Sequence, residues 1–179
     1  MNFRGLLPRS TDTVSLRELE YGDADRYAEG TTDPDVRRFA HLPEAQYTPR
    51  RVRELIDSTL EQGITSGALA VLAIADTRTE QFLGTLVVYD VTPTSAEVGF
   101  WLLPDGRGRG AAGAALRLAK GLARDAGLHR LRARTMVDNT ASRGVLERAG
   151  FTPEGPPSVD TAPSGETATM QDFTLDVRG

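Results

Sequence analysis

A change in the spacing of hydrophobic residues near residue 104 is the feature that most constrains the fold. Residues 68–75, 81–91 and 96–103 have the composition of strands, and only short polar turns separate them. Strands joined by such short turns pair antiparallel. From Ala112 to Ala126 the apolar residues recur at helical spacing, and residues 131–137 alternate again. The chain therefore predicts a meander followed by a strand–helix–strand crossover, which requires a mixed sheet of the α/β (α+β) class.

The segments on either side complete this domain. Alternation predicts a first strand at residues 13–20 and a last strand at 167–177. Helices are expected at 24–30 with Asp23 as N-cap, at 36–39, from Thr48 and Pro49 to the glycines at 63–67, and at 139–149. Residues 152–165 are rich in proline, glycine and serine and are predicted as a loop. The expected order is β-α-α-β-β-β-α-β-α-β.

Length and composition limit the class of protein. The 179 residues suit a single domain spanning 1–179. No apolar run is long enough for a transmembrane helix or a secretory signal, so no membrane association and a cytoplasmic location are expected. The chain has no cysteine and only two histidines. Disulfides and thiolate nucleophiles are therefore excluded, and no metal site is expected.

Positive charge is concentrated in one part of an acidic chain. The net charge is −4, yet residues 104–150 hold ten Lys and Arg against four Asp and Glu. A basic segment inside an acidic protein indicates a local anionic ligand rather than a nucleic-acid surface. A solvated arginine-rich face explains the same charges equally well.

The turn between the third strand of the meander and the long helix is rich in glycine and arginine. It reads Pro-Asp-Gly-Arg-Gly-Arg-Gly-Ala-Ala over residues 104–112. Glycines allow successive backbone N–H groups to face one point, and a helix N-terminus adds unpaired donors and a positive dipole end. The side chains of Arg107 and Arg109 add fork-shaped cationic donors. This combination favours a phosphate cradle over a flexible turn.

Two other phosphate-binding motifs fit this turn less well. A P-loop needs Gly-Lys-Ser/Thr at its end, and Gly-Ala-Ala stands there instead. The dinucleotide pattern G-x-G-x-x-G is formally present as Gly108, Gly110 and Gly113. That fold places the turn after its first buried parallel strand and needs further β-α units, whereas here a meander comes first. A nicotinamide-dependent oxidoreductase therefore remains an alternative.

Two segments carry a family resemblance. Residues 97–112 (EVGFWLLPDGRGRGAA) and 138–151 (DNTASRGVLERAGF) resemble the GNAT acyl-CoA N-acyltransferases, and most closely the branch of ribosomal-protein N-terminal acetyltransferases. The turn from Arg107 to Ala112 is similar to the family motif Q/R-x-x-G-x-G/A. The resemblance covers roughly residues 14–177. It implies a GNAT fold, with helices on both faces of the mixed sheet, and acetyl-CoA as co-substrate.

The resemblance implies a set of donor-binding residues. The turn binds the pyrophosphate of coenzyme A through backbone N–H groups, and the strand before it pairs with the pantetheine arm like an added strand. The asparagine after the next strand touches the pantetheine or a bridging water, although an N-cap role suits it equally. A core role is an alternative for the side chain of Trp101. The implied positions are Phe100, Trp101, Leu102, Arg107, Gly108, Arg109, Gly110, Ala111, Ala112, Asn139 and Ser142.

The resemblance also implies catalytic groups for direct acyl transfer to a primary amine in a ternary complex. Glu97 corresponds to a carboxylate that accepts the amine proton, and its alternative is a solvated strand residue. The usual tyrosine acid is replaced by Leu146. Ser142 corresponds to a serine proposed for that role in the ribosomal branch, and its alternative is an ordinary first-turn helix serine.

The sequence does not identify the amine that accepts the acyl group. Arg37, Arg38, His41 and Tyr47 belong to the region that flanks the acceptor in relatives. Pro156, Pro157 and Ser158 follow Glu154-Gly155, where peptide-acetylating relatives often have arginine. A small-molecule amine and a peptide terminus both fit the sequence as acceptors. The donor carries an acetyl or another short acyl group. Both a monomer and a homodimer are compatible with the sequence. A non-catalytic acyl-CoA-binding module is a further alternative.

Overall fold

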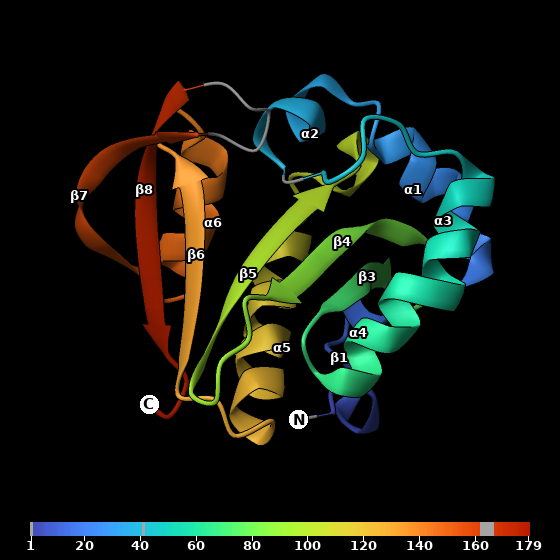
Figure 1. Cartoon of the computed structure of the whole chain (residues 1–179), viewed down its shortest axis with the longest axis horizontal. Helices are drawn as coiled ribbons and strands as arrows, with labels where there is room; N and C mark the ends of the chain where they lie inside the picture. The colour runs from blue at the N-terminus through green and yellow to red at the C-terminus, as the bar shows by residue number, and fades with distance from the viewer. Residues whose placement is uncertain (1, 41, 162–166) are drawn as a thin grey trace.

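A twisted mixed sheet forms the centre of the molecule (Figure 1). The computed structural model describes residues 2–40, 42–161 and 167–179. The strand order is β1-β2-β3-β4-β5-β6-β8-β7, and every neighbouring pair is antiparallel except β5 with β6. The strands are β1 Arg9–Ser10, β2 Val14–Glu18, β3 Ala70–Asp76, β4 Phe82–Tyr89, β5 Ser95–Leu102, β6 Arg130–Met136, β7 Thr152–Thr161 and β8 Thr167–Asp176.

Helices cover both faces of this sheet. Helices α5 and α6 lie behind it in Figure 1, and α3 and α4 lie on the other side. A single π-helical turn, Ile56–Leu60, joins α3 to α4. None of the described helices is long and apolar enough to cross a membrane. The α-helices are α1 Ala24–Gly30, α2 Pro34–Phe39, α3 Pro49–Leu55, α4 Glu61–Ser66, α5 Ala111–Asp125 and α6 Thr140–Arg148; 3₁₀ turns span Arg4–Leu6, Tyr21–Asp23 and Pro104–Gly106.

The expected fold class is confirmed, as are the expected strands and helices within a few residues. The hydroxyl of Thr48 accepts a hydrogen bond from the N–H of Arg51, so it caps α3 as expected. The prediction of a loop over 152–165 is wrong for its described part, because residues 152–161 form β7. Residues 162–166 lie outside the described residues. The two-residue strand β1 was not predicted.

The two faces of the sheet have separate hydrophobic cores. On the α5 face, even-numbered residues of β5 such as Ala96 and Val98 pack with the alanine-rich side of α5. On the opposite face, Trp101 packs with Tyr27 of α1 and with Phe82, at ring-centroid distances of 5.3 and 5.9 Å. Strand β5 is therefore held from both sides.

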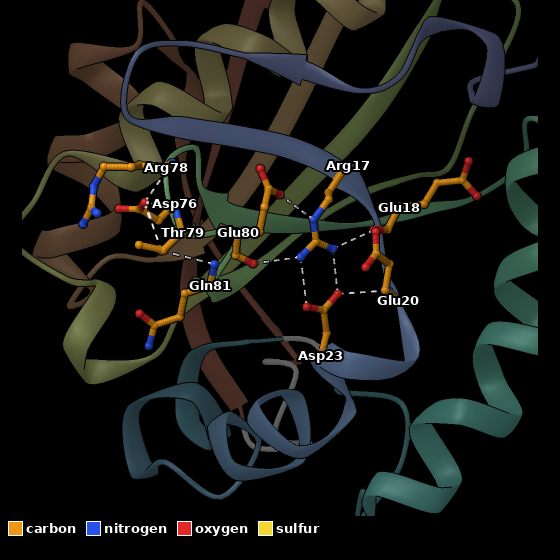
Figure 2. A network of polar contacts seen from close by, with 9 residues as sticks. All are labelled: Arg17, Glu18, Glu20, Asp23, Asp76, Arg78, Thr79, Glu80 and Gln81. Atoms are coloured by element: carbon orange, nitrogen blue, oxygen red, sulfur yellow. Dashed lines mark hydrogen bonds and ion pairs between the residues drawn. The ribbon is translucent and has the colours of Figure 1, made fainter.

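A buried ion pair attaches α1 to the sheet (Figure 2). Arg17 of β2 donates to both carboxylate oxygens of Asp23, at 2.7 and 3.0 Å. The same guanidinium donates to the backbone oxygens of Glu18 and Glu80, and the N–H of Glu20 donates to Asp23. Asp23 was expected to cap α1, but its carboxylate makes no cap bond to that helix. It instead pairs with Arg17 of β2, whose guanidinium also reaches Glu80 in the β3–β4 turn.

We expect Asp23→Ala to lower the free energy of unfolding by about 2 kcal/mol, because the largely buried guanidinium of Arg17 would lose both hydrogen bonds to its main counterion and keep only one ion-pair contact, of 3.3 Å, with the exposed carboxylate of Glu80. The side chains of Asp23 and Arg17 are only 6% and 12% exposed. Urea denaturation measures the change. Asp25→Ala is the matched control, since Asp25 is 73% exposed in its pair with Arg53 and should cost less than about 1 kcal/mol. Equal losses in the two variants would contradict the assignment.

Candidate functional site

The only parallel strand pair among the described residues opens after three register positions. Strand β5 pairs with β6 at Ser95–Arg130, Ala96–Leu131 and Glu97–Arg132. Beyond this point β5 stays paired with β4 as far as Leu102, and β6 stays paired with β8 as far as Met136. Figure 1 shows the two strands separating toward their carboxyl ends. Residues 98–102 therefore present a backbone edge that no other strand pairs, and at its far end the carbonyl of Leu102 accepts a hydrogen bond from Arg107 Nε.

The glycine-rich turn follows this open edge directly. Gly108 and Gly110 have φ angles of 73° and 76°, in the left-handed region that glycine tolerates. A Cβ at either position would meet no atom within 4 Å, so the turn is open on that side. Gly108, Arg109 and Gly110 are exposed, whereas the side chains of Ala111 and Ala112 are buried in the first turn of α5.

The turn and the start of α5 leave their backbone donors free. Within the described part of the chain, no N–H group of residues 108–113 donates a hydrogen bond. Gly110, the N-cap of α5, supplies no side-chain acceptor, and the first turn of the helix carries no acid. Successive free N–H groups at the positive end of a 15-residue helix make a binding site for an anion.

The side chain of Arg107 does not point into this anion site as a free cation. Its Nη2 donates to Asp33 Oδ1 at 2.6 Å, its Nη1 to Asp35 at 3.3 Å, and its Nε to the carbonyl of Leu102 at 3.1 Å. Asp33 also caps α2 through the N–H groups of Asp35 and Val36. Although partial burial opposes it, the contacts to Arg107 and to these N–H groups lower the pKa of Asp33. Arg107 therefore clamps the turn to α2.

Glu97 stands at the point where β5 and β6 separate. Its Oε1 accepts a hydrogen bond of 2.7 Å from the phenol of Tyr89 on β4. Burial, and then the contact with Glu97, raise the pKa of Tyr89, so the phenol remains a donor through the neutral range. Glu97 is only partly exposed and has no ion-pair partner among the described residues. A carboxylate in this position can accept a proton from a group bound beside the open edge.

The start of α6 lies at the same edge of the sheet, because β5 and β6 are parallel there. Asn139 is 9% exposed and accepts a hydrogen bond from the N–H of Ser142, which confirms its N-cap role. Ser142 is partly exposed in the first turn of α6, and no described residue hydrogen-bonds its hydroxyl. Leu146 is 1% exposed and belongs to the core.

The large side chains of β5 beyond Glu97 pack into the two hydrophobic cores. Trp101 is 7% exposed within the aromatic core, while Phe100 and Leu102 are partly buried against the α5-side core. What remains for a ligand along residues 98–102 is therefore the backbone on the side of β6.

The predicted acceptor-side residues are largely engaged with the protein itself. Arg37 donates to the carbonyl of Ala45, and Arg38 pairs with Asp138 at 2.6 Å. The phenol oxygen of Tyr47 accepts from the N–H of Glu44. His41 lies outside the described residues. The pair Arg38–Asp138 joins α2 to the β6–α6 connection.

Two contacts of the site were not predicted from the sequence. Asp33 lies 74 residues before Arg107, and no local pattern connects them. Tyr89 could have been found, because the predicted hairpin places it close to Glu97 on the neighbouring strand. No group of three or more metal-binding side chains occurs among the described residues.

The strand pairing of the sheet argues against the oxidoreductase alternative. The G-x-G-x-x-G pattern falls as expected at the start of α5. However, β5–β6 is the only parallel pair of the described sheet, so the consecutive parallel β-α units of a dinucleotide-binding domain are not formed.

Comparisons with known proteins agree with this geometry. The sequence profile described as "Acetyltransferase (GNAT) domain" matches residues 13–152. No curated protein sequence matches the chain. Among solved structures, a probable acetyltransferase is 23% identical with a TM-score of 0.83, over 97% of this chain and 99% of that one.

Two further structures have named acceptors. Spermidine N-acetyltransferase from Vibrio cholerae, in complex with CoA and spermine, is 18% identical with a TM-score of 0.78, over 94% of this chain and 98% of that one. Ribosomal-protein-S5-alanine acetyltransferase from Vibrio fischeri is 17% identical with a TM-score of 0.80, over 95% and 96% of the two chains. At these identities the similarity establishes a shared fold.

Proposed function

The chain belongs to the GNAT acetyltransferase family, and from this premise we propose how its own residues move the acetyl group. As a member of that family, it is an acetyl-CoA-dependent N-acetyltransferase that transfers an acyl group from coenzyme A to an amine. We propose that the whole chain works as one domain and that the amine attacks the thioester directly in a ternary complex. The open edge of β5 and the free N–H groups beside it are the observation that carries this proposal.

The free N–H groups of residues 108–113 are the proposed binding site for the pyrophosphate of acetyl-CoA. They fit an anion because they are unpaired, exposed at the glycines, and lie at the N-terminus of α5. The unpaired backbone of residues 98–102 fits the pantetheine arm, whose amides can pair with a strand edge. Asn139 and Ser142 lie across the opening, at the carboxyl end of β6.

The proposed chemistry needs a proton acceptor for the amine, and no intermediate in which the enzyme itself carries the acyl group. The amine nitrogen forms a bond to the thioester carbonyl carbon, the carbon–sulfur bond breaks, and the thiolate leaves. Glu97 accepts the proton that the amine loses, directly or through a water. The hydroxyl of Ser142 is the proposed donor to the thiolate, as a relay that takes up a proton from solvent in the same step, because Leu146 occupies the family's tyrosine position. The sequence has no cysteine that could carry the acyl group.

A primary amine is the proposed acceptor, either on a small molecule or at a peptide terminus. Similar structures include enzymes described for spermidine and for a ribosomal protein, which supports both classes. Coenzyme A release, measured with a polyamine, an amino acid, a free peptide and the same peptide with a blocked N-terminus, distinguishes them. No release with any amine would favour a non-catalytic acyl-CoA-binding module.

We expect Gly110→Ala to weaken acetyl-CoA binding about tenfold, as measured by calorimetric titration. The added Cβ would enter the open side of the turn, and a left-handed alanine also strains it by roughly 1 kcal/mol. Gly127→Ala is the matched control at the other end of α5: its φ is 83° against 76° for Gly110, and neither Cβ meets a neighbour within 4 Å. Both variants should lose similar stability, but only Gly110→Ala should lose affinity. Unchanged affinity in both would contradict the assigned pyrophosphate site.

We expect Glu97→Gln to lower kcat at least about tenfold, equivalent to ~1.4 kcal/mol in the barrier, because the amide cannot accept the amine proton. The dissociation constant of acetyl-CoA should change little, since the side chain lies outside the proposed pyrophosphate site. Steady-state rates at saturating acetyl-CoA test this, with the exposed Glu147→Gln on α6 as control. A wild-type rate would remove Glu97 from the mechanism.

A further inference from the structure

Tyr89 and Glu97 face each other across the β4–β5 hairpin. They are directly opposed register partners, so their side chains project from the same face of the sheet. The phenol of Tyr89 donates to Glu97 Oε1 at 2.7 Å. Tyr89 is the last residue of β4, and Asp90 after it has a φ of 47°, which turns the chain away at once. The hairpin therefore holds the backbone of Tyr89 opposite Glu97.

The ring of Tyr89 lies over β5 next to Gly99. A Cβ built on Gly99 would lie 3.8 Å from Tyr89 Cε1, so the ring covers β5 at that glycine. Gly99 is two residues beyond Glu97, past the last register pair between β5 and β6.

The other charged groups around this pair are occupied or make no contact with Glu97. Burial raises the pKa of Tyr89 most, Asp90 directly after β4 also raises it, and Arg134 on β6 lowers it less than burial raises it. Arg134 is paired with Asp160 of β7 at 2.6 Å. Arg132 is the β6 register partner of Glu97, and its buried Nε has no hydrogen-bond partner among the described residues. The phenol of Tyr89 is therefore the one described group that hydrogen-bonds the carboxylate.

We propose that Tyr89 is a positioning residue for acetyl transfer, in that its phenol holds Oε1 of Glu97 and leaves Oε2 to accept the amine proton. This inference rests on the proposed role of Glu97. It assigns a function to a tyrosine outside α6, where Leu146 is part of the core.

The contact predicts a loss of rate without a loss of donor binding. If the phenol acts by orienting Glu97, its removal lowers kcat only where the Glu97 carboxylate is present, and it leaves KM for acetyl-CoA unchanged. A general loss of packing would lower kcat to the same extent with or without that carboxylate.

The test is Tyr89→Phe, which keeps the ring and removes the hydroxyl. We expect kcat to fall about threefold to tenfold and KM for acetyl-CoA to stay unchanged. Tyr21→Phe is the matched control, because Tyr21 also donates its phenol to a carboxylate, that of Asp57, on an exposed part of the molecule. Its kcat and its KM for acetyl-CoA should remain those of the wild type. Thermal unfolding of each variant verifies that it is folded.

The double variant separates the possible outcomes. In the Glu97→Gln background, Tyr89→Phe should have no further effect if it acts through Glu97. An equal loss of kcat in both backgrounds, or an unchanged kcat in Tyr89→Phe alone, would overturn the positioning role while leaving acetyl transfer intact. If Glu97→Gln alone is fully active, the proposed role of Glu97 fails first, and the inference fails with it.

Discussion

The separation of β5 from β6 after Glu97 is the constraint on which the rest of the structure depends. Three register pairs align the two strands, and each then follows its antiparallel partner, β4 or β8. Trp101 anchors the outer part of β5 through Tyr27 and Phe82 on the face opposite α5. Because both cores hold β5 in place, its unpaired backbone stays available rather than closing onto β6.

Two ion pairs hold the glycine-rich turn and the β6–α6 connection against α2. Arg107 leaves the turn and pairs with Asp33, the N-cap of α2. A second pair, Arg38 with Asp138, joins α2 to the connection between β6 and α6. The turn contributes mainly backbone N–H groups, while its first arginine orders the neighbouring helix. The turn can therefore bind an anion through its backbone N–H groups, even though Asp33 and Asp35 already neutralise the side chain of Arg107.

Local patterns predicted most of the fold because each is decided within a few residues. The change of hydrophobic spacing predicted the meander and α5, and the caps Thr48 and Asn139 were identified from their positions. Strand β7 was missed because Pro156 and Pro157 argue against a strand. It is an edge strand whose register with β8 shifts between Glu154 and Ser158, where prolines are tolerated. The contacts Arg107–Asp33 and Arg17–Asp23 depend on how the elements pack, and no local spacing encodes them.

Residue-resolved hydrogen exchange of the β5 amides, with and without acetyl-CoA, tests the central claim most directly. The amides of residues 98–102 that are not bonded to β4 should exchange quickly in the free protein and become protected when acetyl-CoA is added. Residues 95–97, already paired with β6, serve as the internal reference and should change little. Saturable acetyl-CoA binding without new protection in residues 98–102 would contradict the account.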